Sequence, residues 1–178
     1  MLDRTDLEPL FFAPFVSSAM RVEPQWIDFN GHLNVAYYTL LFDRGVDECY
    51  GLIGIGEHYV KTRKASLFAA EAHIAYRREL HVGEAVRITL QLLDFDEKRL
   101  HIFMEMRHAH EGWLAATNES MSLHVDMTTR RVAPFPDDVL GHLALMKSAH
   151  SRLAVPGTVG RAIAMRGSGG GAQGQRRH

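Results

Sequence analysis

Asp28 and the helix start that follows it are the residues of this sequence best suited to chemistry. The stretch from Asp28 to Tyr38 reads DFNGHLNVAYY, and apolar residues then recur at three- and four-residue steps as far as about Leu52. This spacing predicts a helix with one buried face that begins after Asn34. The unpaired amides and positive dipole end of a helix N-terminus favour negative charge. A carboxylate beside such a helix start is a catalytic geometry, although an aspartate that only caps the turn is the alternative.

Two further polar residues, His32 and Asn34, belong to the same stretch. Asn34 is expected to be the N-cap, because its side-chain oxygen can accept a hydrogen bond from a first-turn amide. Tyr37 occupies the third helical position, so there is no capping box. Asn34 can also contact a substrate, but as a cap it would position the anion-stabilising amides. His32 follows Gly31 in a tight loop, where it can hydrogen-bond Asp28 or the loop backbone, and we expect its role to be structural.

Gly45 lies in the middle of the predicted helix. A glycine there costs about 1 kcal/mol relative to alanine. Because a residue without a Cβ lets two backbones come together, we expect the helix to approach its neighbour closely at this point.

A long strand with one polar face is predicted from Ser66 to Glu79. Its residues alternate in polarity, as they do in a strand whose two faces meet different environments. One face is expected to carry Phe68, Ala70, Ala72, Ile74 and Tyr76, and the other Glu71, His73, Arg77 and Glu79. Of the polar set, Glu71 and His73 can line the site or lie in an interface between subunits.

The rest of the pattern predicts an α+β domain. A first strand is expected at 17–25, and three alternating segments joined by short polar turns follow the long strand. These three segments span 86–92, 100–106 and 113–125. Short turns favour antiparallel neighbours. Asp137 or Asp138 is expected to begin a last helix that ends near Lys147. The predicted architecture is therefore a long helix packed on one antiparallel sheet.

The length and charge of the chain limit its domain organisation and partners. Its 178 residues suffice for one domain with a full core, which we place at 17–150 after an irregular lead-in, 1–16. The segment 156–178 is rich in glycine and arginine, and we expect it to be disordered. It holds 4 of the 20 basic residues and none of the 21 acidic ones, so the body has a charge of −5. An acidic body argues against nucleic-acid binding by the fold.

The composition also bears on compartment and metal binding. No apolar run approaches the roughly 20 residues of a membrane helix, so no membrane contact is expected. The single cysteine, Cys49, excludes an internal disulfide and fits a reducing compartment, so we expect a cytoplasmic location. Eleven histidines invite a metal interpretation, but the pair His108 and His110 lacks an accompanying acid motif and falls short of a zinc site.

The motif Asp-x-x-Gly-His-x-Asn-x-x-Tyr-Tyr, at Asp28 to Tyr38, resembles the hotdog-fold acyl-CoA thioesterases of the 4-hydroxybenzoyl-CoA thioesterase type. The resemblance covers about residues 17–147, and the motif is its most specific part. Three shorter stretches resemble the thioesterases of betaine and carnitine metabolism more closely. They are Trp26 to Asn34, Glu71-Ala72-His73 and His124-Val125-Asp126.

The resemblance implies the roles of two groups at the helix start. Asp28 would be the catalytic carboxylate, and the amide near Val35 would polarise the thioester carbonyl. It also implies neither a metal nor an organic cofactor. Some relatives carry Asp-x-Asp where this chain has Trp26-Ile27-Asp28, so help from a first carboxylate is absent. The alternative is a non-catalytic hotdog module that binds acyl-CoA or a protein partner.

Cations and aromatic residues suggest where a substrate would bind. Lys61, Arg63 and Lys64 can meet the phosphates of coenzyme A, or they can form a solvated loop. Trp26 and Tyr37 flank Asp28, and aromatic faces attract quaternary ammonium groups. A small cationic acyl group such as betainyl would then be preferred, whereas the alternative is that both rings belong to the core.

The predicted sheet has an edge that needs covering. The polar and alanine-rich strand from Ser66 to Glu79 leaves one edge open, and edges are normally paired or covered. We therefore expect a homodimer or homotetramer.

Overall fold

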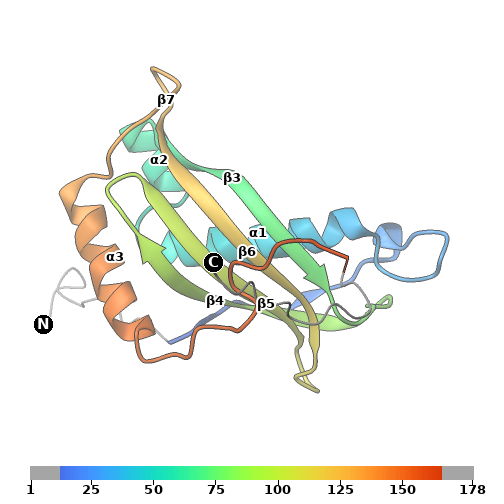
Figure 1. Cartoon of the computed structure of the whole chain (residues 1–178). Coiled ribbons are helices and arrows are strands. Elements are labelled where there is room, and N and C mark those ends of the chain that lie inside the picture. Colours follow the sequence, from blue (N-terminus) through green and yellow to red (C-terminus); the bar gives the residue numbers. More distant parts are fainter. Residues whose placement is uncertain (1–12, 166–178) are drawn as a thin grey trace, which may run out of the picture.

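The computed structural model describes residues 13–165, which form one antiparallel sheet with helices packed on it (Figure 1). The strand order is β1-β4-β5-β6-β3, with β2 also paired to β4 and β7 to β6. The strands are β1 (Phe15–Val16), β2 (Met20–Arg21), β3 (Ala65–Tyr76), β4 (Ala85–Phe95), β5 (Arg99–His108), β6 (Leu114–Asp126) and β7 (Arg131–Val132). The helices are the 3-10 turn η1 (Pro24–Trp26), α1 (Val35–Leu52), α2 (Glu57–Arg63) and α3 (Asp137–His150). The predicted α+β architecture is confirmed.

The long helix α1 lies across one face of the sheet (Figure 1). Its buried residues include Leu41, Phe42 and Cys49, which the helical spacing placed on one face. Gly45 rests on β4 so closely that a Cβ added to it would lie 2.7 Å from Ile88 Cβ. The close approach expected from this glycine is therefore present, and it fixes the height of α1 above the sheet.

The edge strand β3 contains a bulge that the alternation of its residues did not reveal. Its pairing with β6 shifts between Ala69 and Glu71, so Ala70 is the extra residue. Because one extra residue changes the face on which later side chains lie, Phe68 shares a face with Glu71 rather than with Ala72. The single alternating face predicted from Phe68 to Tyr76 is thus wrong at its beginning.

Two local predictions near the helices also need correction. The strand expected at 17–25 is reduced to β2 and the start of η1, and a short strand, β1, lies before it in the lead-in that was expected to be irregular. Ser17 interrupts the ladder between β1 and β2. Its amide donates to the Ile88 carbonyl and its Oγ accepts from the Ile88 amide at 2.9 Å. The loop expected before β3 instead contains α2, which carries Lys61 and Arg63. None of the described helices is long and apolar enough to cross a membrane.

The C-terminal segment passes over the face of the sheet opposite α1 (Figure 1). The Gly160 amide donates to Glu119 Oε2 at 2.8 Å. Phe103, on β5, is 4% exposed and shares a cavity of about 190 Å³ with Leu153, Ala154 and Pro156. Pro156 and Gly160 therefore hold this segment against the sheet, whereas the side chains of Ile163 and Met165 are exposed. The disorder expected for 156–178 stays a prediction for 166–178, which lie outside the described residues.

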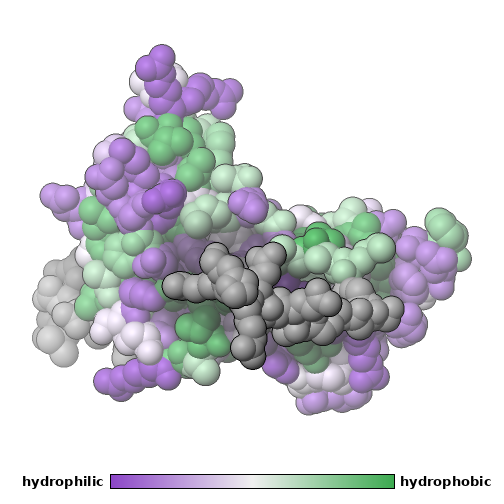
Figure 2. All heavy atoms as spheres, in the orientation of Figure 1, coloured by the Kyte–Doolittle hydropathy of each residue, from purple (hydrophilic) through white to green (hydrophobic). Residues whose placement is uncertain are grey.

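The surface on this side of the molecule mixes hydrophobic and hydrophilic residues (Figure 2). The protruding tip between β6 and β7 is hydrophilic in that view, in keeping with exposed residues at 128–131. The tip that leads into α1 carries Phe29, whose side chain is 98% exposed.

Candidate active site

The loop that carries Asp28 closes tightly on itself. The Asp28 amide donates to the His32 carbonyl, and the Gly31 amide donates back to the Asp28 carbonyl. Gly31 has φ of +85°, a conformation that favours glycine. The Asn30 amide donates to Asp28 Oδ1 at 2.8 Å. Among residues 13–165, Oδ2 has no hydrogen-bond partner, so one oxygen of this half-buried carboxylate remains available for chemistry.

The same loop delivers the chain to the start of α1. Ile27 forms a bridge with Leu33, and the Asn34 amide donates to the Trp26 carbonyl at 2.9 Å. Asn34 is the N-cap, since its Oδ1 accepts from the Ala36 amide at 3.0 Å. The Val35 amide belongs to the first helical residue and has no acceptor within the helix. Val35 is 59% exposed, which leaves the helix start accessible to a ligand.

His32 contributes to the loop through its backbone. Its carbonyl accepts from the Asp28 amide, whereas its ring has no hydrogen bond to Asp28 among the described residues. A different histidine contacts the loop: His81 Nδ1 lies 3.3 Å from the Gly31 carbonyl oxygen. The Leu33 amide also donates to the Leu80 carbonyl at 2.7 Å. The Asp28 loop is therefore attached to the chain that follows β3.

Trp26 and Tyr37 are stacked, with ring centroids 5.2 Å apart and planes inclined by 15°. Trp26 is 5% exposed and belongs to the hydrophobic core. The Arg44 guanidinium lies 5.3 Å from the Trp26 centroid, which is a cation–π contact within the chain. Tyr37 is half-buried. Trp26 is thus a core residue, which was the alternative expected from the sequence, and Tyr37 is the more accessible of the pair.

The cations predicted to meet coenzyme A lie at the far end of β3. Lys61 pairs with Glu57, and Arg63 pairs with Asp138. Lys64 ends α2 just before β3, whereas the Asp28 loop contacts residues that follow the other end of β3. A strand of 12 residues is roughly 36 Å long. Within one chain these cations are not part of the Asp28 site, and their role in binding stays a prediction.

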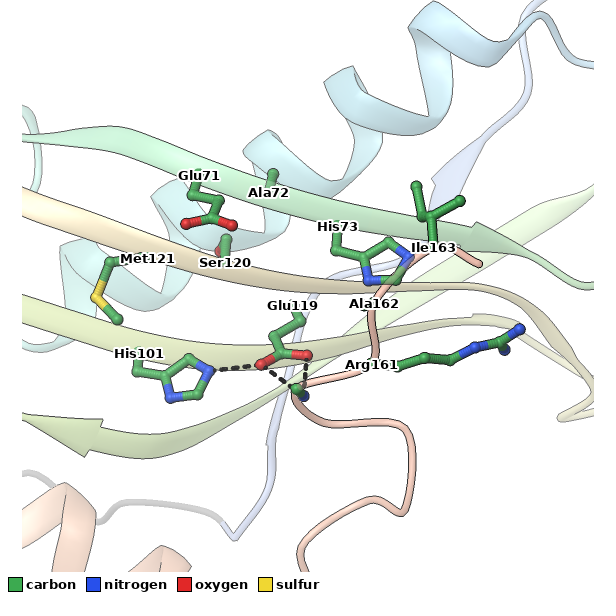
Figure 3. Close-up of a pocket in the computed structure, with 11 residues that line it drawn as sticks. Glu71, Ala72, His73, His101, Glu119, Ser120, Met121, Arg161, Ala162 and Ile163 are labelled. Atoms are coloured by element: carbon green, nitrogen blue, oxygen red, sulfur yellow. Dashed lines mark hydrogen bonds and ion pairs between the residues drawn. The ribbon is translucent and has the colours of Figure 1, made fainter. Parts of the chain in front are cut away.

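Glu71 and His73 lie on the face of the sheet opposite α1, where they line a cavity of about 610 Å³ (Figure 3). In the same cavity His101 Nε2 lies 2.8 Å from Glu119 Oε1, and the segment 160–163 forms a wall. The cavity is separated from the helix start by the sheet. Sequence reasoning missed His101 and Glu119, because only the register of β5 and β6 brings these two residues together.

No group of three metal-ligating side chains exists within residues 13–165. The rings of His108 and His110 contact each other, with centroids 6.0 Å apart, and the His108 ring also stacks on Trp113. These histidines therefore have a packing role in the described part of the chain.

A loop carboxylate held ahead of an open helix N-terminus, on a helix that crosses an antiparallel sheet, can be compared with known proteins. Residues 22–143 match the thioesterase-like superfamily. The chain belongs to this superfamily. The resemblance to hotdog-fold thioesterases seen in the sequence is thereby confirmed, and this thioesterase has relatives of two kinds.

The first kind consists of proteins with named activities. A betainyl-CoA thioesterase of Pseudomonas aeruginosa strain PAO1 is 38% identical over 144 residues, which cover 81% of this chain and 91% of that protein. An L-carnitine dehydrogenase/betainyl-CoA thioesterase of Rhizobium meliloti is 36% identical over 143 residues. That match covers 80% of this chain but 29% of the longer protein.

The second kind consists of solved structures. A Staphylococcus aureus protein determined in complex with CoA has a TM-score of 0.79 and 29% identity to this thioesterase. The match covers 86% of this chain and 96% of that one. The fold of this thioesterase is therefore found in a protein that binds coenzyme A.

Proposed function

We propose that this thioesterase hydrolyses a small, cationic acyl-CoA of the betainyl type to the free acid and coenzyme A. The observation that carries the proposal is the Asp28 carboxylate, which has one oxygen without a partner among the described residues and sits on the tight loop that leads into the open start of α1. Thioester hydrolysis needs an attacking oxygen and a stabilised oxyanion, and these two groups supply both. The proposed chemistry uses neither a metal nor an organic cofactor.

The steps follow from these two groups. Asp28 takes a proton from a water molecule, whose oxygen attacks the thioester carbonyl carbon. The carbonyl oxygen becomes an oxyanion, which accepts a hydrogen bond from the Val35 amide at the positive end of α1. The tetrahedral intermediate then collapses, the carbon–sulfur bond breaks, and the thiolate of coenzyme A leaves and takes up the proton that Asp28 removed from water. Asn34 acts by holding the first turn of α1 in place.

Direct attack by Asp28 is the alternative route. It would form a mixed anhydride between the acyl group and the side chain, which water then hydrolyses. A single turnover in heavy-oxygen water separates the two routes, because only hydrolysis of an anhydride can leave the label in the Asp28 side chain.

The cationic acyl group is supported by the relatives named betainyl-CoA thioesterases and by the aromatic pair beside the loop. A quaternary ammonium over an aromatic face gains about 0.5 to 2 kcal/mol, depending on how dry the site is. The Arg44 guanidinium already lies over Trp26, so the aromatic face offered to a cationic acyl group would be that of Tyr37.

The test is release of free thiol from a panel of acyl-CoAs that includes betainyl-CoA and 3,3-dimethylbutanoyl-CoA. These two acyl groups differ by one quaternary nitrogen in place of carbon. We expect the specificity constant for betainyl-CoA to be about tenfold higher or more. Equal specificity constants for the two thioesters would reject the preference for a cationic acyl group but not the thioesterase activity. Binding of these thioesters without any thiol release would favour the alternative, a non-catalytic module.

The assembly that we propose is a dimer formed by antiparallel pairing of β3 with a second copy of itself. In that arrangement the end of β3 that carries the partner's Lys64 meets the end of β3 that adjoins the Asp28 loop. The cations of α2 would then reach the site from the neighbouring subunit, which they do not do within one chain. Formation of a tetramer and a cytoplasmic location stay predictions.

A further inference from the structure

A second polar pocket, of about 400 Å³, lies beyond the end of β3 (Figure 1 shows this end of the strand). Its lining consists of Arg77, Arg78, Glu79, His81 and Glu84. The pocket adjoins the Asp28 loop, because His81 Nδ1 lies 3.3 Å from the Gly31 carbonyl oxygen and Leu80 holds the Leu33 amide. Any group bound there would lie next to the loop that carries the reacting carboxylate.

The two arginines are held on a fixed backbone with exposed side chains. The Arg77 and Arg78 amides both donate to the Ala115 carbonyl, at 2.8 and 3.1 Å. The Arg78 guanidinium lies 4.0 Å from the centroid of Trp113, which orients it. Within residues 13–165 neither guanidinium has a carboxylate or carbonyl partner, in contrast to Arg63, which pairs with a carboxylate.

The carboxylates of this pocket are directed at His81. Glu84 Oε2 accepts from the His81 amide at 2.8 Å, and Glu79 Oε1 lies 3.5 Å from His81 Nε2. They therefore leave the hydrogen-bonding edges of the two guanidiniums available to an external acceptor.

We propose that Arg77 and Arg78 bind a phosphate group of the coenzyme A carrier. The proposal rests on the proposed function, which makes an acyl-CoA the ligand of the adjoining loop. A guanidinium presents its N–H donors in a planar fork that fits phosphate oxygens, and two adjacent guanidiniums complement a multiply charged phosphate. The site belongs to the same chain as its Asp28 loop, unlike the cations of α2.

The experiment compares a thioester that has phosphates with one that has none. The double variant Arg77→Gln/Arg78→Gln is assayed with an acyl-CoA and with the same acyl group on pantetheine. KM for the acyl-CoA should rise about ten- to hundredfold, because charge-assisted hydrogen bonds are lost. The specificity constant for the acyl-pantetheine should stay within about twofold of the wild-type value.

A matched control is the double variant Arg130→Gln/Arg131→Gln, which removes another adjacent pair of exposed arginines, at the turn into β7. It should change neither substrate constant. An unchanged KM for the acyl-CoA in the Arg77 and Arg78 variant would overturn the proposal. Equal losses on both substrates would also overturn it, because they would show that the arginines only support the fold of the loop.

Calorimetry with free coenzyme A and with its form lacking the 3′-phosphate separates this inference from the proposed function. If the wild-type protein hydrolyses no thioester, loss of coenzyme A binding in the Arg77 and Arg78 variant still supports the phosphate site. Equal binding to wild type and variant rejects it. A variant defect that disappears with the ligand lacking the 3′-phosphate assigns the site to that phosphate, whereas a defect that persists assigns it to the pyrophosphate.

Discussion

The proposed role of Asp28 depends on the surroundings of its two carboxylate oxygens. One of its oxygens is fixed by the Asn30 amide, so the side chain keeps a single orientation. The other oxygen has no partner within the described residues, and the loop that carries it leads into the start of α1. In the proposed reaction the first oxygen would hold the side chain in place and the second would face the water molecule.

Asp28→Asn is expected to keep the fold and lose activity. The asparagine Oδ1 can still accept from the Asn30 amide, so the loop should retain its conformation. The rate of thiol release under saturating acyl-CoA should fall at least about a hundredfold, because an amide can neither attack nor take up a proton. Asp43→Asn, an exposed change of the same type on α1, should leave the rate unchanged. A variant at position 28 with wild-type turnover would end the assignment.

Sequence reasoning found those candidate site residues whose neighbours lie close in the chain. Asn34 and Val35 fall at a helix start that the spacing predicted, and the motif that resembles the thioesterases singled out Asp28 in the same loop. The pair His101 and Glu119 depends on the pairing of two strands, which spacing does not reveal.

At the scale of elements, the contact between α1 and β4 depends on Gly45. An added Cβ would lie 2.7 Å from Ile88 Cβ and 2.8 Å from Ile88 Cγ1, and neither atom can move away cheaply. Gly45→Ala gains about 1 kcal/mol in helix propensity but incurs overpacking of about 1 to 3 kcal/mol or more. We expect a net loss of about 1 to 2 kcal/mol in the free energy of unfolding, measured by urea denaturation.

Gly51 provides the matched control in the same helix. A Cβ added there would meet nothing within 4 Å. Gly51→Ala should therefore leave the free energy of unfolding unchanged or raise it by up to about 1 kcal/mol. If Gly45→Ala and Gly51→Ala changed the free energy of unfolding equally, the close approach to Ile88 would not be the reason for a glycine at position 45.

The C-terminal segment should contribute to stability by covering Phe103. Removal of the chain after Arg152 deletes Leu153 and Pro156, which share the cavity with that ring. Exposure of a phenylalanine costs about 1.5 to 3 kcal/mol, so the free energy of unfolding should fall by about 2 kcal/mol. A chain that ends at Met165 should unfold like the full chain.

A double-mutant cycle assigns this loss to Phe103. Phe103→Thr should destabilise the full chain more than the chain shortened after Arg152, because in the shortened chain the ring is already exposed. Equal losses in the two backgrounds would show that the segment stabilises the sheet in another way, for example through the hydrogen bond from Gly160 to Glu119.

The elements that sequence reasoning missed share a physical cause. The bulge at Ala70 and the short helix α2 are set by contacts with distant parts of the chain, such as β6 and the ion pair between Arg63 and Asp138. The long periodic elements α1, β4, β5 and β6 carry their own pattern, and they were predicted nearly to their ends.

At the scale of the whole molecule, the two groups of cations that we propose to bind coenzyme A lie at opposite ends of β3. Arg77 and Arg78 follow one end of the strand, next to the Asp28 loop, and Lys64 precedes the other end. A two-fold dimer through β3 would bring the partner's Lys64 to the end that carries Arg77. Two cationic groups, one from each subunit, would then flank each site. In a single chain the Asp28 site would have only Arg77 and Arg78 beside it.

The dimer itself can be tested at Ala70, which lies at the middle of β3 on its exposed edge. A two-fold axis near this residue would bring its two copies together, because the same surface meets itself in such a dimer. Ala70→Lys and Ala70→Glu should each weaken the dimer by like-charge repulsion, whereas an equimolar mixture should restore it by opposite charge.

Light scattering at micromolar concentration should give twice the 20.1 kDa chain mass for the wild type and for the mixture, and a lower mass for each variant alone. A wild-type mass near that of one chain would reject the dimer. If each variant alone were still a dimer, the interface would not be formed by β3. If the partner's Lys64 also contributes to binding, each variant alone should show a higher KM for acyl-CoA, and mixing the two should lower it again.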